Sequence, residues 1–122
     1  MKKILVVDDS RIMRNIVKNT FSAMKIPCEY FEASNGKAAL EILQMQKIDL
    51  VLLDWNMPEI SGLALLIKVR AMEEFKTLPI IMVTSESARY NVIDALKSGA
   101  TDYIIKPVND KIFFEKILKI RF

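Results

Sequence analysis

Five polar side chains that could do chemistry stand directly after short apolar runs of this sequence. They are three carboxylates, a hydroxyl and an ammonium: Asp8, Asp9, Asp54, Thr84 and Lys106. A carboxylate can attack phosphorus as a nucleophile and form an acyl phosphate. A hydroxyl and an ammonium can bind the phosphoryl oxygens, because phosphoryl transfer depends mainly on positioning and on neutralised charge. The residue types therefore favour phosphoryl transfer to a carboxylate, if the fold brings them together.

The apolar runs are typical of strands that are buried on both faces of a sheet. Ile4–Val7, Leu50–Leu53 and Leu78–Val83 are short, rich in branched residues and do not alternate with polar ones. Tyr103–Ile105 predicts another such strand. Cys28–Ala33 includes two glutamates and predicts a strand nearer the edge of the sheet.

Apolar residues at helical spacing follow each of these strands. The expected helices are 12–24, 38–47, 63–72, 88–98 and 110–121. Ser10 and Ser61 are expected N-caps, Asn109 or Asp110 caps the last helix, and Gly99 suits the end of the fourth. Asn35 and Gly36 are expected to form a turn.

Strand and helix therefore alternate five times, which argues for an α/β protein with a parallel sheet covered on both faces. Right-handed crossovers and burial of the central strands favour a doubly wound sheet. Of the two common strand orders, 3-2-1-4-5-6 and 2-1-3-4-5, five strands suit the second.

Length and composition restrict the possible classes of protein. The chain has 122 residues, a net charge of +3 and no histidine, so a metal would be held by oxygen ligands. It has no apolar run of the ~18 residues that a membrane helix needs and no recognisable leader, so we expect one cytoplasmic domain. The lone Cys28 is expected to be inert. The densest basic stretch could bind nucleic acid but is more typical of a solvated helix: Lys111, Lys116, Lys119 and Arg121.

The five polar side chains are expected to meet, because the carboxyl ends of parallel strands share one edge of the sheet. Three carboxylates at that edge repel one another and require a cation. Lys106 supplies one positive charge, and Mg²⁺ suits the remaining oxygen ligands. Asp54 is the best nucleophile because its strand is the most central. Asp8 and Asp9 would hold the metal, although Asp9 could instead serve only as a helix cap.

Four motifs, in order and spread over essentially the whole chain, resemble the receiver domain of bacterial response regulators. They are Val6–Ser10, Asp54–Pro58 with Gly62, Val83–Thr84 and Lys106–Pro107. The likeness is closest to the stand-alone chemotaxis regulators of that family. It implies a flavodoxin-like (βα)5 sheet of order 2-1-3-4-5 and a single receiver domain over residues 1–122 with no output domain.

The resemblance also assigns roles to the residues at the expected site. Asp54 would accept a phosphoryl group from a histidine kinase. Asp9, Asp54 and the backbone carbonyl of Asn56 would bind Mg²⁺, with Asp8 assisting through water. Outside its own phosphorylation and slow dephosphorylation, such a protein is not an enzyme.

Further roles concern switching and output. Lys106 would contact the phosphoryl group, Thr84 would move toward it and Tyr103 would turn inward on activation. Asn56 and Glu86 occupy positions that tune the lifetime of the phosphoryl group. Output would pass through the fourth helix, fifth strand and fifth helix, at Arg89, Tyr90, Val92, Tyr103 and Lys116.

Stand-alone chemotaxis receivers act by binding other proteins. The expected partners are a chemotaxis kinase and a flagellar motor switch protein, with a phosphatase as a further candidate. Val108 and Ile60–Ser61 depart from the common family pattern, so a phosphorelay intermediate that passes phosphate to a histidine phosphotransfer protein stays open. A haloacid-dehalogenase-type phosphatase would carry Asp-x-Asp after its first strand, whereas here Asp8 and Asp9 are adjacent.

The last helix carries two apolar stripes where one would suffice to pack on the sheet. The first comprises Phe113, Ile117 and Ile120, and the second comprises Phe114, Leu118 and Phe122. The second stripe could dock a partner or another copy of an otherwise monomeric chain, or it could simply be buried.

Overall fold

The computed structural model describes residues 1–85, 89–120 and 122, and only the backbone of Arg89 and Tyr90. Its five strands form one parallel sheet in the order β2-β1-β3-β4-β5, which confirms the predicted fold and strand order. The strands are β1 (Lys2–Val7), β2 (Cys28–Ala33), β3 (Leu50–Leu53), β4 (Ile80–Thr84) and β5 (Asp102–Ile105).

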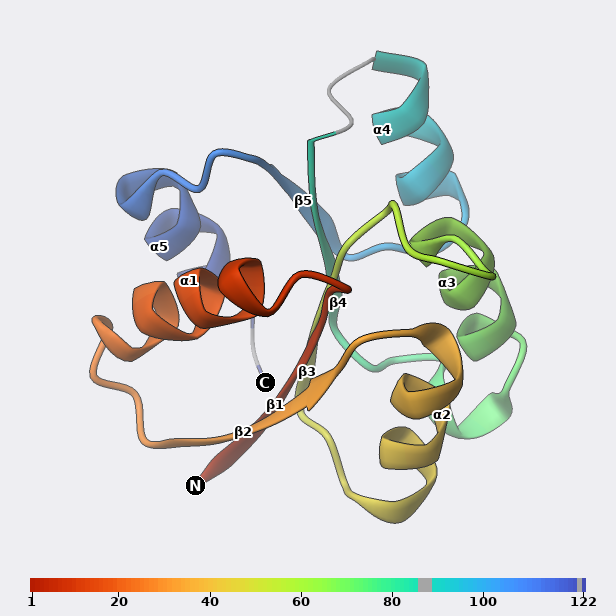
Figure 1. The fold of residues 1–122 in the computed structure, drawn as a ribbon, viewed down its shortest axis with the longest axis horizontal. Coiled ribbons are helices and arrows are strands. Elements are labelled where there is room, and N and C mark those ends of the chain that lie inside the picture. Colours follow the sequence, from red (N-terminus) through yellow and green to blue (C-terminus); the bar gives the residue numbers. More distant parts are fainter. Residues whose placement is uncertain (86–88, 121) are drawn as a thin grey trace.

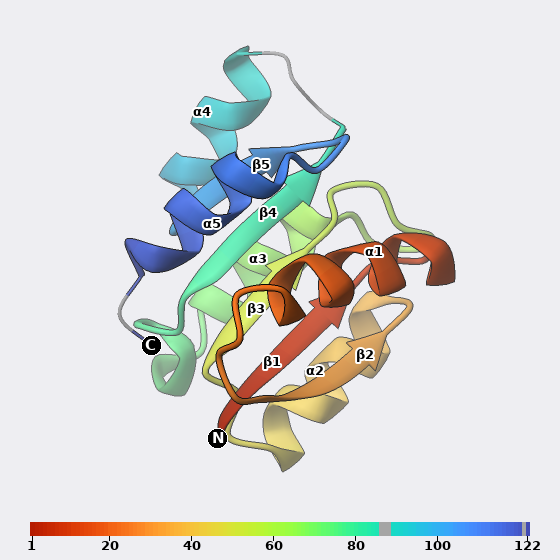
Figure 2. The same ribbon diagram turned by 90° about the vertical axis from the view of Figure 1, so that its left-hand side faces the viewer.

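Helices cover both faces of the sheet. They are α1 (Arg11–Ser22), α2 (Gly36–Met45), α3 (Gly62–Arg70), α4 (Arg89–Lys97) and α5 (Asp110–Leu118), with a short 3-10 helix η1 (Glu73–Phe75) before β4. Figure 1 shows α1 and α5 on one side of the sheet and α2, α3 and α4 on the other. In Figure 2, α1 and α5 lie in front of the strands. None of the described helices is long and apolar enough to cross a membrane.

The core consists of two apolar layers, one on each face of the sheet. In β1, Leu5 and Val7 belong to the layer under α2 and α3, whereas Ile4 and Val6 belong to the layer under α1 and α5. All four residues of β3 are buried, as a central strand requires. A rigid, fully paired centre of this kind can hold the strand ends in fixed positions.

The helix ends agree with the expected caps, and Gly99, with φ of 108°, follows the end of α4 at Lys97 as expected. Ser10, Ser61 and Asn109 each accept a hydrogen bond from the backbone N–H three residues later. Asn35 also caps a helix, so α2 begins at Gly36 and the predicted turn is the helix N-terminus. The last helix ends at Leu118, before the expected end at Arg121, which lies outside the described residues.

The second apolar stripe of α5 is largely covered. Phe114 and Phe122 pack against the layer under α1 and α5, and the Phe122 ring lies 6.3 Å from the ring of Phe21. Leu118 alone of the three remains widely exposed, at 72%. A free three-residue stripe is therefore wrong for Phe114 and Phe122. Phe114 packs against the apolar layer, and Phe122 lies against Phe21 because the chain end folds back onto α1. Self-association through this helix stays an untested expectation.

Candidate functional site

The sheet's hydrogen-bond ladder extends into the polar residues at its carboxyl edge. Three of these residues donate a backbone N–H to a carbonyl near the end of a neighbouring strand: Asp8 to Ala33 at 3.1 Å, Asp54 to Val7 at 2.9 Å and Lys106 to Thr84 at 2.9 Å. Their backbones are thus fixed by the strands before any side-chain contact forms. The strand order places β1 and β3 side by side, so Asp8 and Asp54 become neighbours.

Three carboxylates meet at this edge, as the sequence predicted. Asp8, Asp9 and Asp54 each present an oxygen, and these three atoms lie within 4.8 Å of one another. Asp8 and Asp54 are almost fully buried, at 4% and 6% exposed, whereas Asp9 faces solvent. Such close carboxylates are a costly arrangement unless cations are present.

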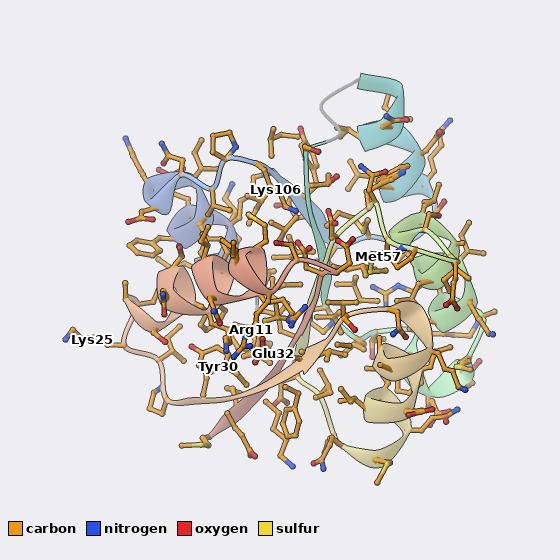
Figure 3. All side chains as sticks on the ribbon, in the orientation of Figure 1. Arg11, Lys25, Tyr30, Glu32, Met57 and Lys106 are labelled. Carbon is orange, nitrogen blue, oxygen red and sulfur yellow. The ribbon has the colours of Figure 1, made fainter. Side chains whose placement is uncertain are left out.

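Lys106 reaches this cluster from the end of β5. Its Nζ lies 2.9 Å from Asp8 Oδ2 and 3.2 Å from Asp54 Oδ1. In Figure 3, Lys106 lies at the end of the sheet where the central strands finish. Burial opposes the charge of Lys106, but its contacts with Asp8 and Asp54 outweigh burial and raise the pKa of the ammonium. Lys106 is therefore a fixed positive charge between two buried carboxylates.

Burial, and then the negative charge of Asp8, raise the pKa of the Asp54 carboxyl above its usual value, and Lys106 only partly opposes this. The unfolded chain binds the Asp54 proton less tightly than the folded protein does. Ionised Asp54 therefore lowers the free energy of unfolding. The full cost applies at pH values above the pKa of Asp54 in the folded protein, and it shrinks as the pH falls toward the pKa in the unfolded chain.

We expect Asp54→Asn to be more stable than the native protein at pH 7, because the amide carries no buried charge. The difference in the free energy of unfolding should shrink on acidification, as native Asp54 takes up its proton. Urea unfolding of both proteins between pH 7 and pH 4 measures this. A variant that is less stable at pH 7, or a gap that widens in acid, contradicts the assigned environment of Asp54.

The residues at this edge fit a divalent cation. Three carboxylates and one ammonium sum to a charge of about −2 when all are ionised. Their donors are hard oxygens, which suit Mg²⁺ rather than a soft metal. Asn56, the further expected ligand, lies exposed in the loop after Asp54.

The remaining predicted site residues are placed only in part. Thr84 is buried at the end of β4 and pairs in the ladder with Ile105, directly before Lys106. Glu86 lies outside the described residues, and its expected role has no structural counterpart here.

Gly62 holds the loop after Asp54 close to the site. Its N–H donates to the carbonyl oxygen of Trp55 at 2.7 Å. A Cβ at position 62 would overlap the backbone carbonyl oxygen of Asp54. The loop can close over β3 in this way only with glycine at its end.

We expect Gly62→Ala to lower the free energy of unfolding by about 3 kcal/mol, because the methyl group must displace backbone beside Asp54. Urea unfolding measures the loss. Gly36→Ala is the matched control, since its Cβ would meet the flexible end of Ile60 at 2.6 Å rather than backbone. Equal losses in the two variants would show that the loop does not need this close approach.

A second polar cluster lies on the outer side of β5. Lys116 places its Nζ 4.4 Å from the centre of the Tyr103 ring and 2.9 Å from Asp102 Oδ1. Tyr103 and Lys116 also line a shallow cavity of about 280 Å³ between β5 and α5, together with Ile104, Ile105, Pro107, Asn109 and Ile112.

This cavity brings together two of the five residues expected at the output surface. Val92 is half-buried on α4, and the side chains of Arg89 and Tyr90 lie outside the described part of the chain. The sequence analysis missed Asp102 and Ile112. Ile112 is 47% exposed and follows Asp110 and Lys111. An apolar residue on an otherwise polar helix face was the signal that could have indicated its place at this surface.

The fold and site define a doubly wound α/β protein with a carboxylate cluster and a lysine at the carboxyl edge of its sheet. This is the edge at which such sheets bind ligands. Comparison with known proteins gives the family. The model of the response regulator receiver domain matches residues 4–118, and the chain belongs to this family of two-component signalling proteins.

The relatives of the chain include chemotaxis proteins. It is 47% identical over 116 residues to the chemotaxis protein CheY1 of Helicobacter pylori, covering 94% of this chain and 93% of that protein. The solved structure of the chemotaxis protein CheY4 of Vibrio cholerae matches with a TM-score of 0.88 and 30% identity, over 99% of both chains. The Mn²⁺-bound response regulator Rcp1 matches with a TM-score of 0.81 and 27% identity, over 98% of this chain and 91% of that one.

Proposed function

We propose that this chain is a stand-alone response regulator that is phosphorylated on Asp54 and carries a chemotaxis signal to the flagellar motor switch. The observation that supports phosphorylation best is the buried Asp54 carboxylate, 3.2 Å from Lys106 and grouped with Asp8 and Asp9. The stand-alone role is supported by the extent of the match to CheY1, which covers 93% of that protein.

In the proposed reaction, an oxygen of Asp54 attacks the phosphorus of a phosphorylated histidine on a kinase. The bond from phosphorus to the histidine nitrogen breaks, and the imidazole leaves with the electron pair and takes up a proton. Lys106 is already within ion-pair distance of Asp54, so it can bind a phosphoryl oxygen without a large movement. Thr84, buried at the adjacent strand end, supplies a hydroxyl for another.

Mg²⁺ bound to this site would neutralise the charge that develops on the transferring phosphoryl group. Asp8, Asp9, Asp54 and the backbone carbonyl of Asn56 are the residues proposed to hold it. The Mn²⁺-bound structure of Rcp1 supports a divalent cation in a protein of this fold. Deprotonated Asp54 is needed both for the metal and for attack on phosphorus. Burial raises the pKa of Asp54 in the metal-free protein, and a bound divalent cation would oppose this by favouring the ionised carboxylate.

Signalling would follow from a shift between two conformations that exist before phosphorylation. Thr84 and Lys106 are joined through the backbone hydrogen bond at the end of β4 and β5. Tyr103 lies on the same strand as that junction, beside the cavity under α5. A movement at Thr84 could therefore reach Tyr103 and the proposed output surface along β5.

We expect Lys116→Ala to weaken binding of the activated protein to a motor switch peptide about fivefold, because the variant removes a charged side of the cavity and frees the Tyr103 ring. Phosphorylation of Asp54 should be unchanged, since Lys116 makes no contact with the carboxylate cluster. Lys119→Ala, on an exposed side chain outside the cavity, is the matched control. Calorimetric titration measures both affinities, and an equal effect of the two variants contradicts the assignment of this surface.

The test of the whole proposal uses the native protein with beryllofluoride as a mimic of the phosphoryl group. We expect the activated form to bind a flagellar motor switch peptide at least tenfold more tightly than the unactivated form. A chemotaxis kinase should transfer its phosphoryl group to Asp54 in the presence of Mg²⁺. Transfer onward to a histidine phosphotransfer protein, with no binding to the motor switch, would instead show a phosphorelay intermediate.

A further inference from the structure

We propose that Arg14 is a positioning residue that fixes the Asp8–Asp9 peptide for metal binding, and that Glu32 holds Arg14 in place. The inference rests on the proposed metal site and adds two residues to it. Neither residue belongs to the five polar side chains at the carboxyl edge of the sheet.

Arg14 links three parts of the fold through two different nitrogens. Its Nη1 donates to the backbone carbonyl oxygen of Asp8 at 2.7 Å, and its Nε donates to Glu32 Oε1 at 3.0 Å. The side chain is only 14% exposed. A planar guanidinium makes both contacts at once, so α1, β2 and the loop after β1 are joined by one side chain.

Glu32 is the anchor of this link on the sheet. It lies on β2, where its second carboxylate oxygen, Oε2, accepts a hydrogen bond from Lys18 at 2.9 Å. The hydrogen bond from Lys18, and then that from Arg14, overcome the effect of burial and lower the pKa of Glu32. Figure 3 shows Glu32 between α1 and β2. Glu32 thus stays ionised and holds the guanidinium of Arg14, whose Nη1 reaches the Asp8 carbonyl.

The carbonyl that Arg14 binds belongs to the peptide between Asp8 and Asp9. The orientation of this peptide sets the direction in which the Asp9 side chain leaves the backbone. Asp9 is exposed, and among the described residues its carboxylate has no hydrogen bond or ion pair of its own. Asp9 therefore depends on the backbone to stay within reach of Asp8 and Asp54.

The other contacts of this loop do not fix that peptide plane. Asp8 N–H extends the ladder to Ala33, and Ser10 N–H donates to Asp8 Oδ1 at 2.9 Å. Both hold parts of the loop on either side of the Asp8 carbonyl. The contact from Arg14 is the one that acts on the carbonyl itself.

The positive charge of Arg14 and its positioning role predict opposite effects of Arg14 on Mg²⁺ affinity, and this makes the inference testable. A nearby guanidinium repels a divalent cation, so simple removal of its charge would tighten metal binding. If positioning dominates, removal of Arg14 weakens binding instead, as the loss of a group that orients a metal ligand does. The sign of the change separates the two roles.

The experiment is a Mg²⁺ titration followed by the fluorescence of Trp55, the only tryptophan, with native protein and four variants. We expect Arg14→Met and Arg14→Lys each to weaken Mg²⁺ binding about tenfold, because a lysine keeps the charge but cannot make both contacts. Glu32→Gln should weaken it about threefold. Lys18→Met is the matched control, since it removes the other ion pair of Glu32 without touching the loop, and should change the affinity less than twofold.

Hydrogen exchange of the Ser10 amide in the metal-free protein gives a second readout. We expect about tenfold faster exchange in Arg14→Met and no change in Lys18→Met. The inference is overturned if Arg14→Met tightens Mg²⁺ binding or leaves it unchanged, if Arg14→Lys restores native affinity, or if the Ser10 exchange rates do not differ. A native protein that binds no Mg²⁺ would contradict the proposed function, and the Ser10 amide would still decide whether Arg14 fixes the loop. Glu32→Gln keeps the test valid if Arg14→Met does not fold.

Discussion

Replacing Asp54 with asparagine is expected to abolish phosphorylation of the protein by acetyl phosphate and Mg²⁺. An amide oxygen is a poor nucleophile toward phosphorus, so the variant lacks the proposed phosphoacceptor. The native protein should gain the mass of one phosphoryl group, and the variant should gain none, a loss of at least ~1000-fold in rate. Intact-protein mass spectrometry after borohydride trapping measures both.

Asp8→Asn is the matched control for this prediction. Asp8 is equally buried and also pairs with Lys106, at 2.9 Å. The control should keep the phosphoacceptor and react more slowly, about tenfold, because its contribution is to the charge of the proposed metal site. A phosphoryl group that still forms in Asp54→Asn, or that maps to Asp8 or Asp9 in the native protein, would show that another carboxylate is the acceptor.

Replacing Lys106 with methionine is expected to lower the free energy of unfolding of the metal-free protein by about 3 kcal/mol. The variant leaves Asp8 and Asp54 buried without their shared counter-ion, which is the costly way to break a buried ion pair. The same change should increase Mg²⁺ affinity, because it removes a positive charge that competes with the cation. Added Mg²⁺ should therefore restore much of the lost stability.

Urea unfolding with and without Mg²⁺ measures both effects of Lys106→Met. Lys116→Met is the control: it also removes an ion pair, but from the partly exposed surface of α5, and should cost less than about 1 kcal/mol. Equal losses for the two lysines would mean that Lys106 does not stabilise the carboxylate cluster. A variant with weaker Mg²⁺ binding would mean that Lys106 helps to shape the metal site rather than competing for it.

The sheet and the carboxylate cluster could be predicted from the sequence because both follow from local patterns. Non-alternating runs such as Leu50–Leu53 indicate buried parallel strands, and the residue after each run must then lie at one edge. The strand order decides which of these residues are neighbours. Asp8 and Asp54 lie together because β1 and β3 are adjacent, an order that five strands only favoured and that the structure confirms.

Other features could not be predicted because they depend on contacts between distant residues. Arg14, on α1, contacts both the Asp8 carbonyl after β1 and Glu32 on β2, and no local pattern of the sequence shows that these three residues meet. The covering of Phe122 depends on the chain end folding back onto α1, where its ring lies 6.3 Å from that of Phe21. Glu59 adopts a left-handed backbone, with φ of 71°, in the loop that closes at Gly62, and no residue type at that position signals it.

The fluorescence of Trp55 most directly tests the claim that Asp54 is a metal-dependent phosphoacceptor. Trp55 follows Asp54 in the chain, and the Trp55 carbonyl accepts the hydrogen bond from Gly62 that closes the loop. The protein would be titrated with Mg²⁺ and then given acetyl phosphate or beryllofluoride, with Asp54→Asn alongside. A Mg²⁺-dependent change followed by a second, donor-dependent change that is absent from Asp54→Asn is the expected result. If neither Mg²⁺ nor the donor alters the fluorescence, and calorimetry also detects no Mg²⁺ binding, Asp54 is not a metal-dependent phosphoacceptor and the proposed function is wrong.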